Sequence, residues 1–215
     1  MGAAAKDTAA LLSQLGESGV AFAAALGSGT DQASMANFMS DMTQAEVDAI
    51  GKEITVDEAG NATISDAGLT ALGVTRDQFE QLATTFGISV QDLTNNLSGA
   101  YNQVSETIAS NQEYFTKAGI DASKMSVAEQ ARLISGKDAF NKQADTQGLG
   151  KNSLDAVIAQ NANLDPEKLV AFVSGMSNIS LTSEDAVKQI QDLADTYGVQ
   201  GDAITSLMGQ VEGLD

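Results

Sequence analysis

The sequence predicts an all-α fold: a mostly α, multi-helix array of orthogonal and bundled helices with helix–turn–helix corners and one small β-hairpin near residues 53–65. Three observations predict it. The 215 residues include one proline, so the residue that most often breaks helices is nearly missing. Helix-capping sequences and helix-ending glycines recur along the chain. A single segment shows the alternating pattern of strands instead.

Helix starts are marked by side chains that accept hydrogen bonds from the first helical turn. Such residues stand at Thr43, Thr75, Ser89, Ser126, Asp165 and Thr182. After Thr43 and Ser126 a glutamate follows three residues on, which completes a capping box. Thr182 has an acid at the same spacing, and Asp165 precedes Pro166, which suits the first helical position. Each of these residues is expected to begin a helix.

Four helix ends share one glycine pattern. A glycine is followed by Val or Ile, and an apolar residue falls six positions after the glycine. Glycine takes the left-handed conformation past a helix end, and the next residue folds back on the last turn. The four pairs are Gly73-Val74, Gly87-Ile88, Gly119-Ile120 and Gly198-Val199, followed by Phe79, Leu93, Met125 and Ile204. The chain is therefore expected to use one helix–turn–helix unit at least four times.

Two of these corners resemble each other over a longer stretch. Residues 79–93 align without gaps on residues 190–204, within the broader segments 79–97 and 190–208. Four identical pairs carry the likeness: Leu82 and Leu193, Ala83 and Ala194, Thr85 and Thr196, Gly87 and Gly198. Duplication of two halves and convergence on favourable turn chemistry both explain the likeness.

The strand-like segment separates two helical regions. Residues 53–56 and 61–64 alternate around Asp57-Glu-Ala-Gly60, which predicts a two-stranded hairpin that must lean on a helix. The expected organisation is an N-terminal helical segment (1–52), the hairpin (53–65) and a helical domain (66–215), which holds two related halves if the corners are a duplication.

The longest helix is expected over residues 90–115, about 39 Å at 1.5 Å per residue. Its apolar stripe runs through Val90, Leu93, Leu97, Tyr101, Val104, Ile108 and Phe115, with Asn111 on the same line. Spacings of three and four residues are typical of a coiled-coil seam. Two readings follow: a core helix of one domain, or a helix through which copies of the chain form a homo-oligomer.

The formal net charge of −18 repels phosphate backbones and anionic membranes. Residues 1–75 hold ten carboxylates against Lys6 and Lys52, whereas residues 117–151 hold six basic residues against four acids. Head-to-tail pairing of copies and a plain solvated surface are the two readings of this asymmetry. No stretch has the length of a membrane span, and Val20–Leu26 lacks the features of a signal peptide. The expected location is the cytoplasm or a virion.

The chain contains no histidine and no cysteine. Ser-His-Asp triads, thiol nucleophiles and thiolate zinc sites are therefore excluded. No glycine-rich phosphate loop follows a strand, and the acidic stretch from Asp57 to Asp66 lacks the ligand spacing of an EF-hand. The sequence predicts no catalytic residue, no cofactor site and no metal site, and so a protein that is not an enzyme.

One catalytic alternative rests on paired carboxylates. Glu17-Ser18-Gly19 resembles the catalytic Glu-Ser of lytic transglycosylases, which implies a carboxylate-based cell-wall hydrolase. Those enzymes also carry a Gly-Leu-Met-Gln-like element at moderate distance, and here Leu207-Met208-Gly209-Gln210 is far away and in a different order. The other reading of Glu17 is an ordinary acid at a helix end.

A second alternative is a DNA-binding regulator. Residues 81–93 resemble a DNA-binding helix–turn–helix through Ala83 in the first helix, Gly87 in the turn, and Val90 and Leu93 in the second helix. Recognition of DNA also needs basic residues that contact phosphates, and no Lys or Arg lies between Arg76 and Lys117. The same apolar positions pack any tight two-helix corner, so a protein-binding corner is the other reading.

Most of the chain is similar in style to helical virion proteins of tailed phages, of the tape-measure and internal or ejected types. The similarity lies in Ala-, Gly-, Thr-, Gln- and Asn-rich helices with glycine-ended corners and no histidine. It implies assembly partners, repeated copies, and helices that span or line a tube. The sequence therefore predicts a non-enzymatic structural, assembly or interaction component that binds proteins and not nucleic acid.

Overall fold

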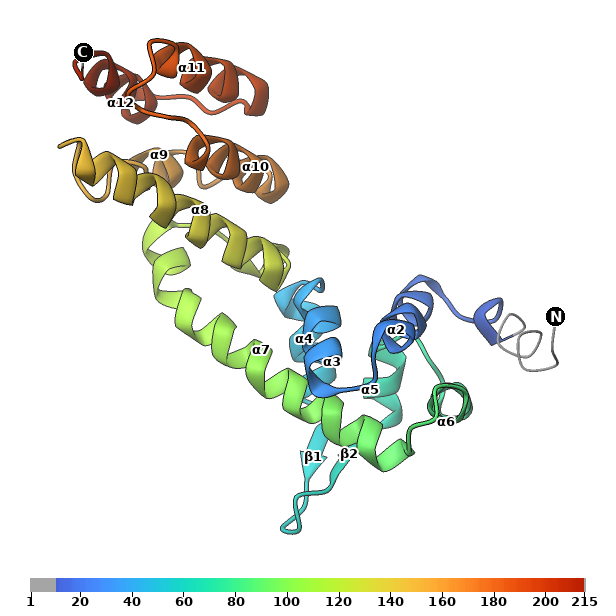
Figure 1. The fold of residues 1–215 in the computed structure, drawn as a ribbon. Helices are drawn as coiled ribbons and strands as arrows, with labels where there is room; N and C mark the ends of the chain where they lie inside the picture. The colour runs from blue at the N-terminus through green and yellow to red at the C-terminus, as the bar shows by residue number, and fades with distance from the viewer. Residues whose placement is uncertain (1–10, 215) are drawn as a thin grey trace. The chain divides into compact units, whose positions relative to one another are not determined.

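The structure, a computed structural model, describes residues 11–214 (Figure 1). The chain is mostly helical, with 69% helix, 11 helices within the described range, and one small two-stranded antiparallel hairpin. The expected all-α fold class with a small hairpin is confirmed. Among residues 11–214, no helix has the length and the hydropathy that crossing a membrane requires.

The chain divides into two compact units, with the boundary between Ile108 and Ala109. The first unit contains α2 (Glu17–Ser28), α3 (Gln32–Ser40), α4 (Gln44–Gly51), β1 (Ile54–Val56), β2 (Ala62–Ile64), α5 (Asp66–Ala71), α6 (Arg76–Thr85) and the first part of α7 (Val90–Ala118). The second unit contains the rest of α7, the 3₁₀ helix η1 (Ala122–Lys124), α8 (Val127–Thr146), α9 (Asp155–Gln160), α10 (Pro166–Ser177), α11 (Ala186–Tyr197) and α12 (Asp202–Glu212). The three-part organisation expected around residues 53–65 divides the chain differently and stays a prediction.

The core of the first unit forms around three phenylalanines. The ring centroid of Phe22 on α2 lies 5.5 Å from that of Phe38 on α3 and 6.0 Å from that of Phe79 on α6, stacked on the latter. All three side chains are buried. Aromatic pairs at this separation add attraction beyond the burial of their apolar area. The N-terminal helices and α6 are therefore held to one core.

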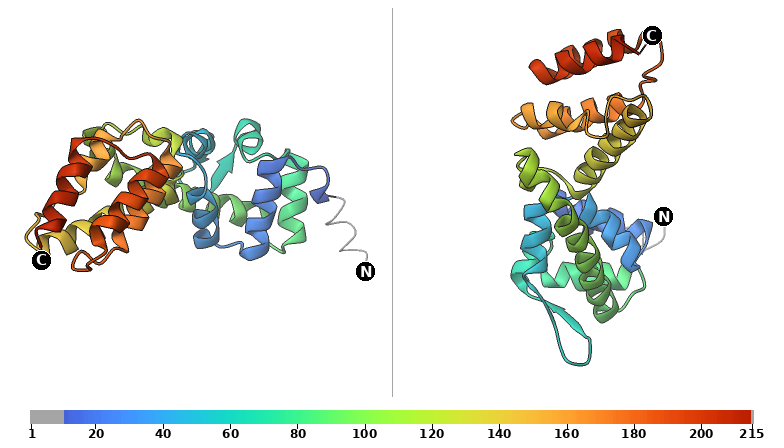
Figure 2. Two further views of the ribbon diagram at one scale, coloured as in Figure 1. Left: turned by 90° about the horizontal axis from the view of Figure 1, so that it is seen from above. Right: turned by 90° about the vertical axis from the view of Figure 1, so that its left-hand side faces the viewer.

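The core of the second unit is built on α10. This helix packs against α8 and α11, and α12 packs against α11 and α9 (Figure 2). Phe115, Phe140 and Phe172 are fully buried in the same cluster. At Gly136 a Cβ atom would press against Val173 of α10, so the glycine lets α8 and α10 approach closely.

The four glycine corners form as the sequence predicts. Their glycines are Gly73, Gly87, Gly119 and Gly198, with φ between 69° and 78°. In each corner the next N–H donates to the carbonyl five residues back, at 2.9–3.0 Å: Val74 to Leu69, Ile88 to Ala83, Ile120 to Phe115, and Val199 to Ala194. This is the Schellman arrangement. The apolar residue six positions after each glycine is buried.

A fifth corner of the same kind ends α8. Gly148 has φ 80°, and the Leu149 N–H donates to the Ala144 carbonyl at 2.9 Å. Leu154, six positions after the glycine, is fully buried. The sequence rule required Val or Ile after the glycine and therefore missed this corner, although leucine also folds back on the last turn.

Five of the six expected helix starts are confirmed. Thr43 and Ser126 form complete capping boxes, Thr75 and Ser89 cap α6 and α7, and Asp165 accepts hydrogen bonds in front of Pro166. The start expected after Thr182 is wrong. Leu181 is buried, and the N–H groups of Ser183 and Ala186 bond within a turn over residues 180–186. Because that turn anchors Leu181 in the core, α11 begins only at Ala186.

The predicted long helix exists as α7, which continues three residues beyond the expected end. Of its apolar stripe, Leu93, Leu97, Val104, Ile108 and Phe115 are buried by the chain itself. Val90 is 37% exposed and does not belong to the seam. Most of the stripe thus behaves as a core seam in the described residues, and a homo-oligomer through this helix stays a prediction.

Candidate interaction surface

The hairpin forms at the predicted place, and its two outer edges differ. Ile54 pairs with Ile64, Thr55 with Thr63, and Val56 with Ala62. The Asp57 N–H donates to the Asn61 carbonyl, and the Ser65 N–H donates to the Glu53 carbonyl. Bonded and non-bonded pairs alternate along an antiparallel ladder. The backbone groups of residues 54, 56, 62 and 64 therefore point away from the ladder.

The outer edge of β2 is closed by side chains. The Ala62 N–H donates to Oδ1 of Asn95 at 2.8 Å, and Nε2 of Gln91 donates to the Ala62 carbonyl at 2.9 Å. Nη2 of Arg76 donates to the Ile64 carbonyl at 2.9 Å. Gln91 and Asn95 lie one turn apart on α7, so one helix face satisfies both backbone groups of Ala62.

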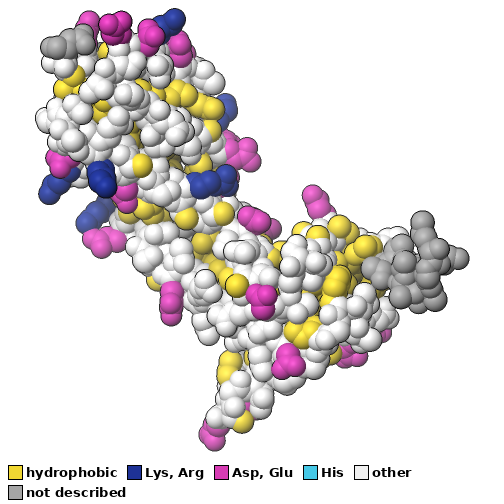
Figure 3. All heavy atoms as spheres, viewed as in Figure 1, with side chains coloured by type: hydrophobic (Ala, Val, Ile, Leu, Met, Phe, Trp, Pro, Cys, Tyr) yellow, Lys and Arg dark blue, Asp and Glu magenta, His cyan; other side chains and the backbone are white. Residues whose placement is uncertain are grey.

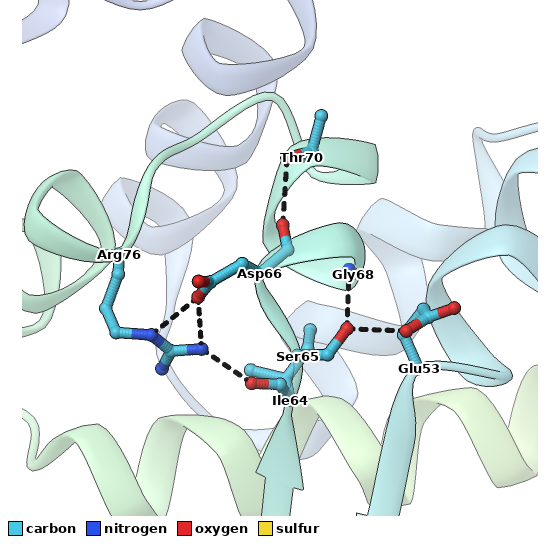
Figure 4. A network of polar contacts seen from close by, with 7 residues as sticks. All are labelled: Glu53, Ile64, Ser65, Asp66, Gly68, Thr70 and Arg76. Carbon is cyan, nitrogen blue, oxygen red and sulfur yellow. Dashed lines mark hydrogen bonds and ion pairs between the residues drawn. The ribbon is translucent and has the colours of Figure 1, made fainter.

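A polar network fixes the base of the hairpin (Figure 4). Arg76 forms an ion pair with Asp66, with 2.7 Å between Nη2 and Oδ1. The Ser65 hydroxyl donates to the Glu53 carboxylate and accepts from the Gly68 N–H, which caps α5. The hairpin is thus tied to α5, α6 and α7, which supplies the support that two isolated strands lack.

The turn of the hairpin is organised by Asp57. Its Oδ1 accepts from the N–H groups of Ala59 and Asn61, at 2.9 and 2.8 Å. The Asn61 backbone N–H, and then its side-chain amide, hold the pKa of Asp57 below its ordinary value. The carboxylate is therefore charged at neutral pH and keeps the turn in one shape.

The outer edge of β1 has no such closure. Its outward-pointing backbone groups belong to Ile54 and Val56, and the side chains that close β2 have no counterpart here among the described residues. Val56 is 56% exposed, the highest value among the large apolar side chains found exposed. Figure 1 shows the hairpin extending beyond the helices of its unit. The β1 edge is therefore open to solvent.

The surroundings of the hairpin are acidic. Glu53, Asp57, Glu58 and Asp66 lie in or beside it, with no basic residue between positions 53 and 66. From position 11 to 108 the chain has thirteen acids against Lys52 and Arg76, and Arg76 is paired. On the face drawn in Figure 3, acidic side chains appear at the hairpin tip and around the helices of this unit. The open edge thus lies in a negative field.

Three of the eight basic residues of the second unit form ion pairs with nearby acids. Lys117 lies 2.6 Å from Glu113, and Lys124 lies 3.4 Å from Asp121. Lys137 lies 2.8 Å from Asp138, with its side chain 14% exposed. The three paired residues are half of the six basic residues over residues 117–151, and head-to-tail pairing of copies stays a prediction.

Glu17 lines an open groove of about 950 Å³ between α2 and α3. Asp41 and Glu46 line the same groove, along with Ala21 and Phe38. Glu17 itself is exposed in the first turn of α2, where a carboxylate is favourable to the helix. The structure thus brings together carboxylates that the sequence did not link.

Glu46 is already engaged in this groove. Its Oε2 accepts from the Thr43 N–H at 2.8 Å and from the Thr43 hydroxyl at 2.7 Å. The hydrogen bond from the Thr43 N–H is half of the capping box of α4, so Glu46 serves the start of that helix. Asp41 is the remaining carboxylate that lines the groove with Glu17.

The predicted helix–turn–helix of residues 81–93 exists as α6, the Gly87 corner and the start of α7. The polar side chains of its second helix serve contacts within the chain. Gln91 and Asn95 bind the hairpin, and Nδ2 of Asn96 donates to the Thr30 carbonyl at 2.8 Å. These side chains are therefore not free to contact bases.

A polar cluster in the second unit joins α7, α8 and α9. Nζ of Lys137 lies 4.4 Å from the Tyr114 ring centroid and 3.9 Å from Oδ1 of Asp155. Nδ2 of Asn141 donates to Oδ2 of Asp155 at 2.6 Å. The Tyr114 hydroxyl is buried without a hydrogen-bond partner, and burial, with the charges of Asp155 and Asp138, raises its pKa. Because its charges are compensated internally, the cluster is a structural tie.

Among residues 11–214, no group of three or more acidic side chains is placed to hold a metal ion. Comparisons with models of protein families, with curated proteins and with solved structures each found no match. The function is therefore argued from the geometry and charge of the chain itself.

The hairpin is predictable from the sequence, but its open edge and its attachment to α6 and α7 are not. The partners of Ala62 lie 33 and 29 positions further along the chain. No local pattern indicates such pairs. A weak signal was present: Gln91 and Asn95 stand at helical spacing beside the apolar stripe, where polar residues often contact a neighbouring element.

Proposed function

We propose that the chain is a non-enzymatic assembly component that binds another protein through its acidic first unit, in a virion or tail of the phage type that its sequence resembles. The observation that carries this proposal is the anchored hairpin, which presents an open strand edge inside an uncompensated negative field. Such a field attracts a basic protein surface and repels nucleic acid and a second copy.

Zero-length cross-linking with a carbodiimide tests the proposal, because it joins carboxylates to lysines in direct contact. The chain is treated in its native assembly, and the linked peptides are identified by mass spectrometry. We expect links from first-unit carboxylates to lysines of one other protein in a fixed ratio. Links confined to pairs within this chain, such as Glu113 with Lys117, would contradict the proposed role.

The carboxylate-based cell-wall hydrolase is a second candidate, favoured by the groove that Glu17 shares with Asp41. Two observations argue against it: the groove is open, and Glu46 in that groove is taken up by the capping box of α4. We expect the chain to leave the turbidity of a cell-wall suspension unchanged. The hydrolase would be established instead if the chain cleared the suspension, if Glu17→Gln abolished this clearing, and if Glu80→Gln on α6 left it intact.

A further inference from the structure

We propose that the outer edge of β1 takes an extended, basic segment of a protein partner as the third strand of the sheet. This inference rests on the proposed function and names the partner's chemistry. Its basis is the contrast between the two edges: side chains close β2, whereas β1 is left open.

The open edge offers the groups that strand addition needs. The N–H and C=O groups of Ile54 and Val56 all point outward, which gives an incoming strand two donors and two acceptors. Main-chain hydrogen bonds of this kind give affinity in β-augmentation, and alternate side chains give specificity. The exposed Val56 side chain supplies an apolar contact on one face of the added strand.

The added strand would also stabilise the sheet. Two strands are marginal alone, and three strands with support from a helix are stable. The network of Arg76, Asp66 and Ser65 holds the base of the hairpin in place before binding. The partner therefore orders itself on an edge that is already formed, which lowers the entropic cost of binding.

Charge selects the partner. Glu53, Asp57 and Glu58 flank the edge. Two copies could pair antiparallel through β1, with Ile54 of each copy opposite Val56 of the other. In this register, Asp57 of each copy would lie opposite Glu53 of the other copy. Like charges in such positions are destabilising, and acidic edges of this kind discourage self-association. A segment with lysine or arginine at alternate positions meets the same carboxylates favourably.

The test is a titration of the isotope-labelled full chain, followed by the NMR amide signals. The probe is a capped heptapeptide of alternating lysine and valine, and the matched probe replaces lysine with glutamate. We expect the basic peptide to shift the Ile54 and Val56 amide signals and slow their hydrogen exchange. The acidic peptide should leave both unchanged.

Variants separate the backbone contribution from the charge contribution. Val56→Pro removes one outward donor without touching a ladder bond and should weaken binding about tenfold, as expected for one hydrogen bond. Val56→Ala keeps that donor and should retain most of the affinity. Glu58→Lys should weaken binding of the basic peptide, whereas Glu80→Lys on α6 should not. If Val56→Pro unfolds the hairpin, seen as lost protection of Thr55 and Thr63, the Glu58 and Glu80 pair decides the question.

Shifts confined to other elements, equal binding of the acidic peptide, or no binding at all would overturn this inference. The proposed function fails separately. One result would reject strand addition and keep the assembly role. In that result, cross-links form from first-unit carboxylates outside the hairpin, and the Ile54 and Val56 amide signals do not change when the basic peptide is added.

Discussion

Ala62 shows how single side chains decide what the hairpin can do. Its two backbone groups are satisfied by Asn95 and Gln91 of α7, so no other strand can pair there. Arg76 closes the Ile64 carbonyl on the same edge. At the residue scale, three polar side chains thus direct any strand pairing toward β1.

The attachment of the hairpin can be tested at Asn95. We expect Asn95→Ala to lower the free energy of unfolding by about 1 kcal/mol, the typical contribution of one hydrogen bond. Amide exchange of residues 54–64 should accelerate more than that of α2. Asn102→Ala, at an exposed position of the same helix, serves as the control and should change neither quantity. Equal effects of the two substitutions would show that Asn95 does not anchor the hairpin.

Tyr114 tests the polar cluster of the second unit. Its hydroxyl is buried and unpartnered, so Tyr114→Phe should raise the free energy of unfolding by about 1 kcal/mol while the ring keeps its contact with Lys137. The pKa of this tyrosine is raised in the folded protein, so its contribution to stability is present below about pH 10 and is lost as pH rises above that value.

Denaturant unfolding at pH 8 and pH 11 measures both effects. The wild-type chain should lose stability between these pH values, and the Phe variant should lose less. A Phe variant that is less stable at pH 8 would reveal a hydrogen-bond partner for the hydroxyl. Lys137→Met provides a comparison, because it removes the cation beside the ring and should destabilise the fold.

At the element scale, one glycine-ended corner recurs five times along the chain. Its geometry depends on a positive φ that residues with a Cβ rarely adopt. The apolar residue six positions after each of these glycines is buried. The same unit therefore ends helices in both units of the chain.

Two glycines separate corner geometry from helix propensity. Gly198 lies at a corner with φ 76°, and Gly209 lies inside α12; neither has an atom within 4 Å of an added Cβ. We expect Gly198→Ala to cost about 1 kcal/mol of unfolding free energy through backbone strain. Gly209→Ala should stabilise by a similar amount, since alanine favours helices. Thermal unfolding checks both, and equal shifts of the melting temperature would refute the corner assignment.

The elements were predictable where local chemistry decides them. Capping boxes, the Asp165-Pro166 start, four corners and the hairpin follow from residues close together in the chain. Local chemistry failed at Thr182, where burial of Leu181 favours a turn over an earlier helix start. The burial predicted for Val90 was also wrong. Its helical phase suits the seam, but its position at the start of α7 leaves it exposed.

At the scale of the whole molecule, the candidate site was only partly predictable. The acidity of the N-terminal half is visible in the sequence, but the open strand edge emerges only when α6 and α7 close the opposite side. The homo-oligomer expected through residues 90–115 stays a prediction, although the chain buries most of that seam itself. Net charge and edge geometry together favour a different, basic partner.

The most direct test of this central claim is the absolute mass of the chain alone, measured by size-exclusion chromatography with light scattering. The concentration is varied at low salt, where repulsion between acidic copies is least screened. We expect a monomer of 22.1 kDa at every concentration. A stable oligomer of fixed order at low salt would contradict it, because copies would then associate through a surface that neither the buried seam nor the acidic hairpin provides.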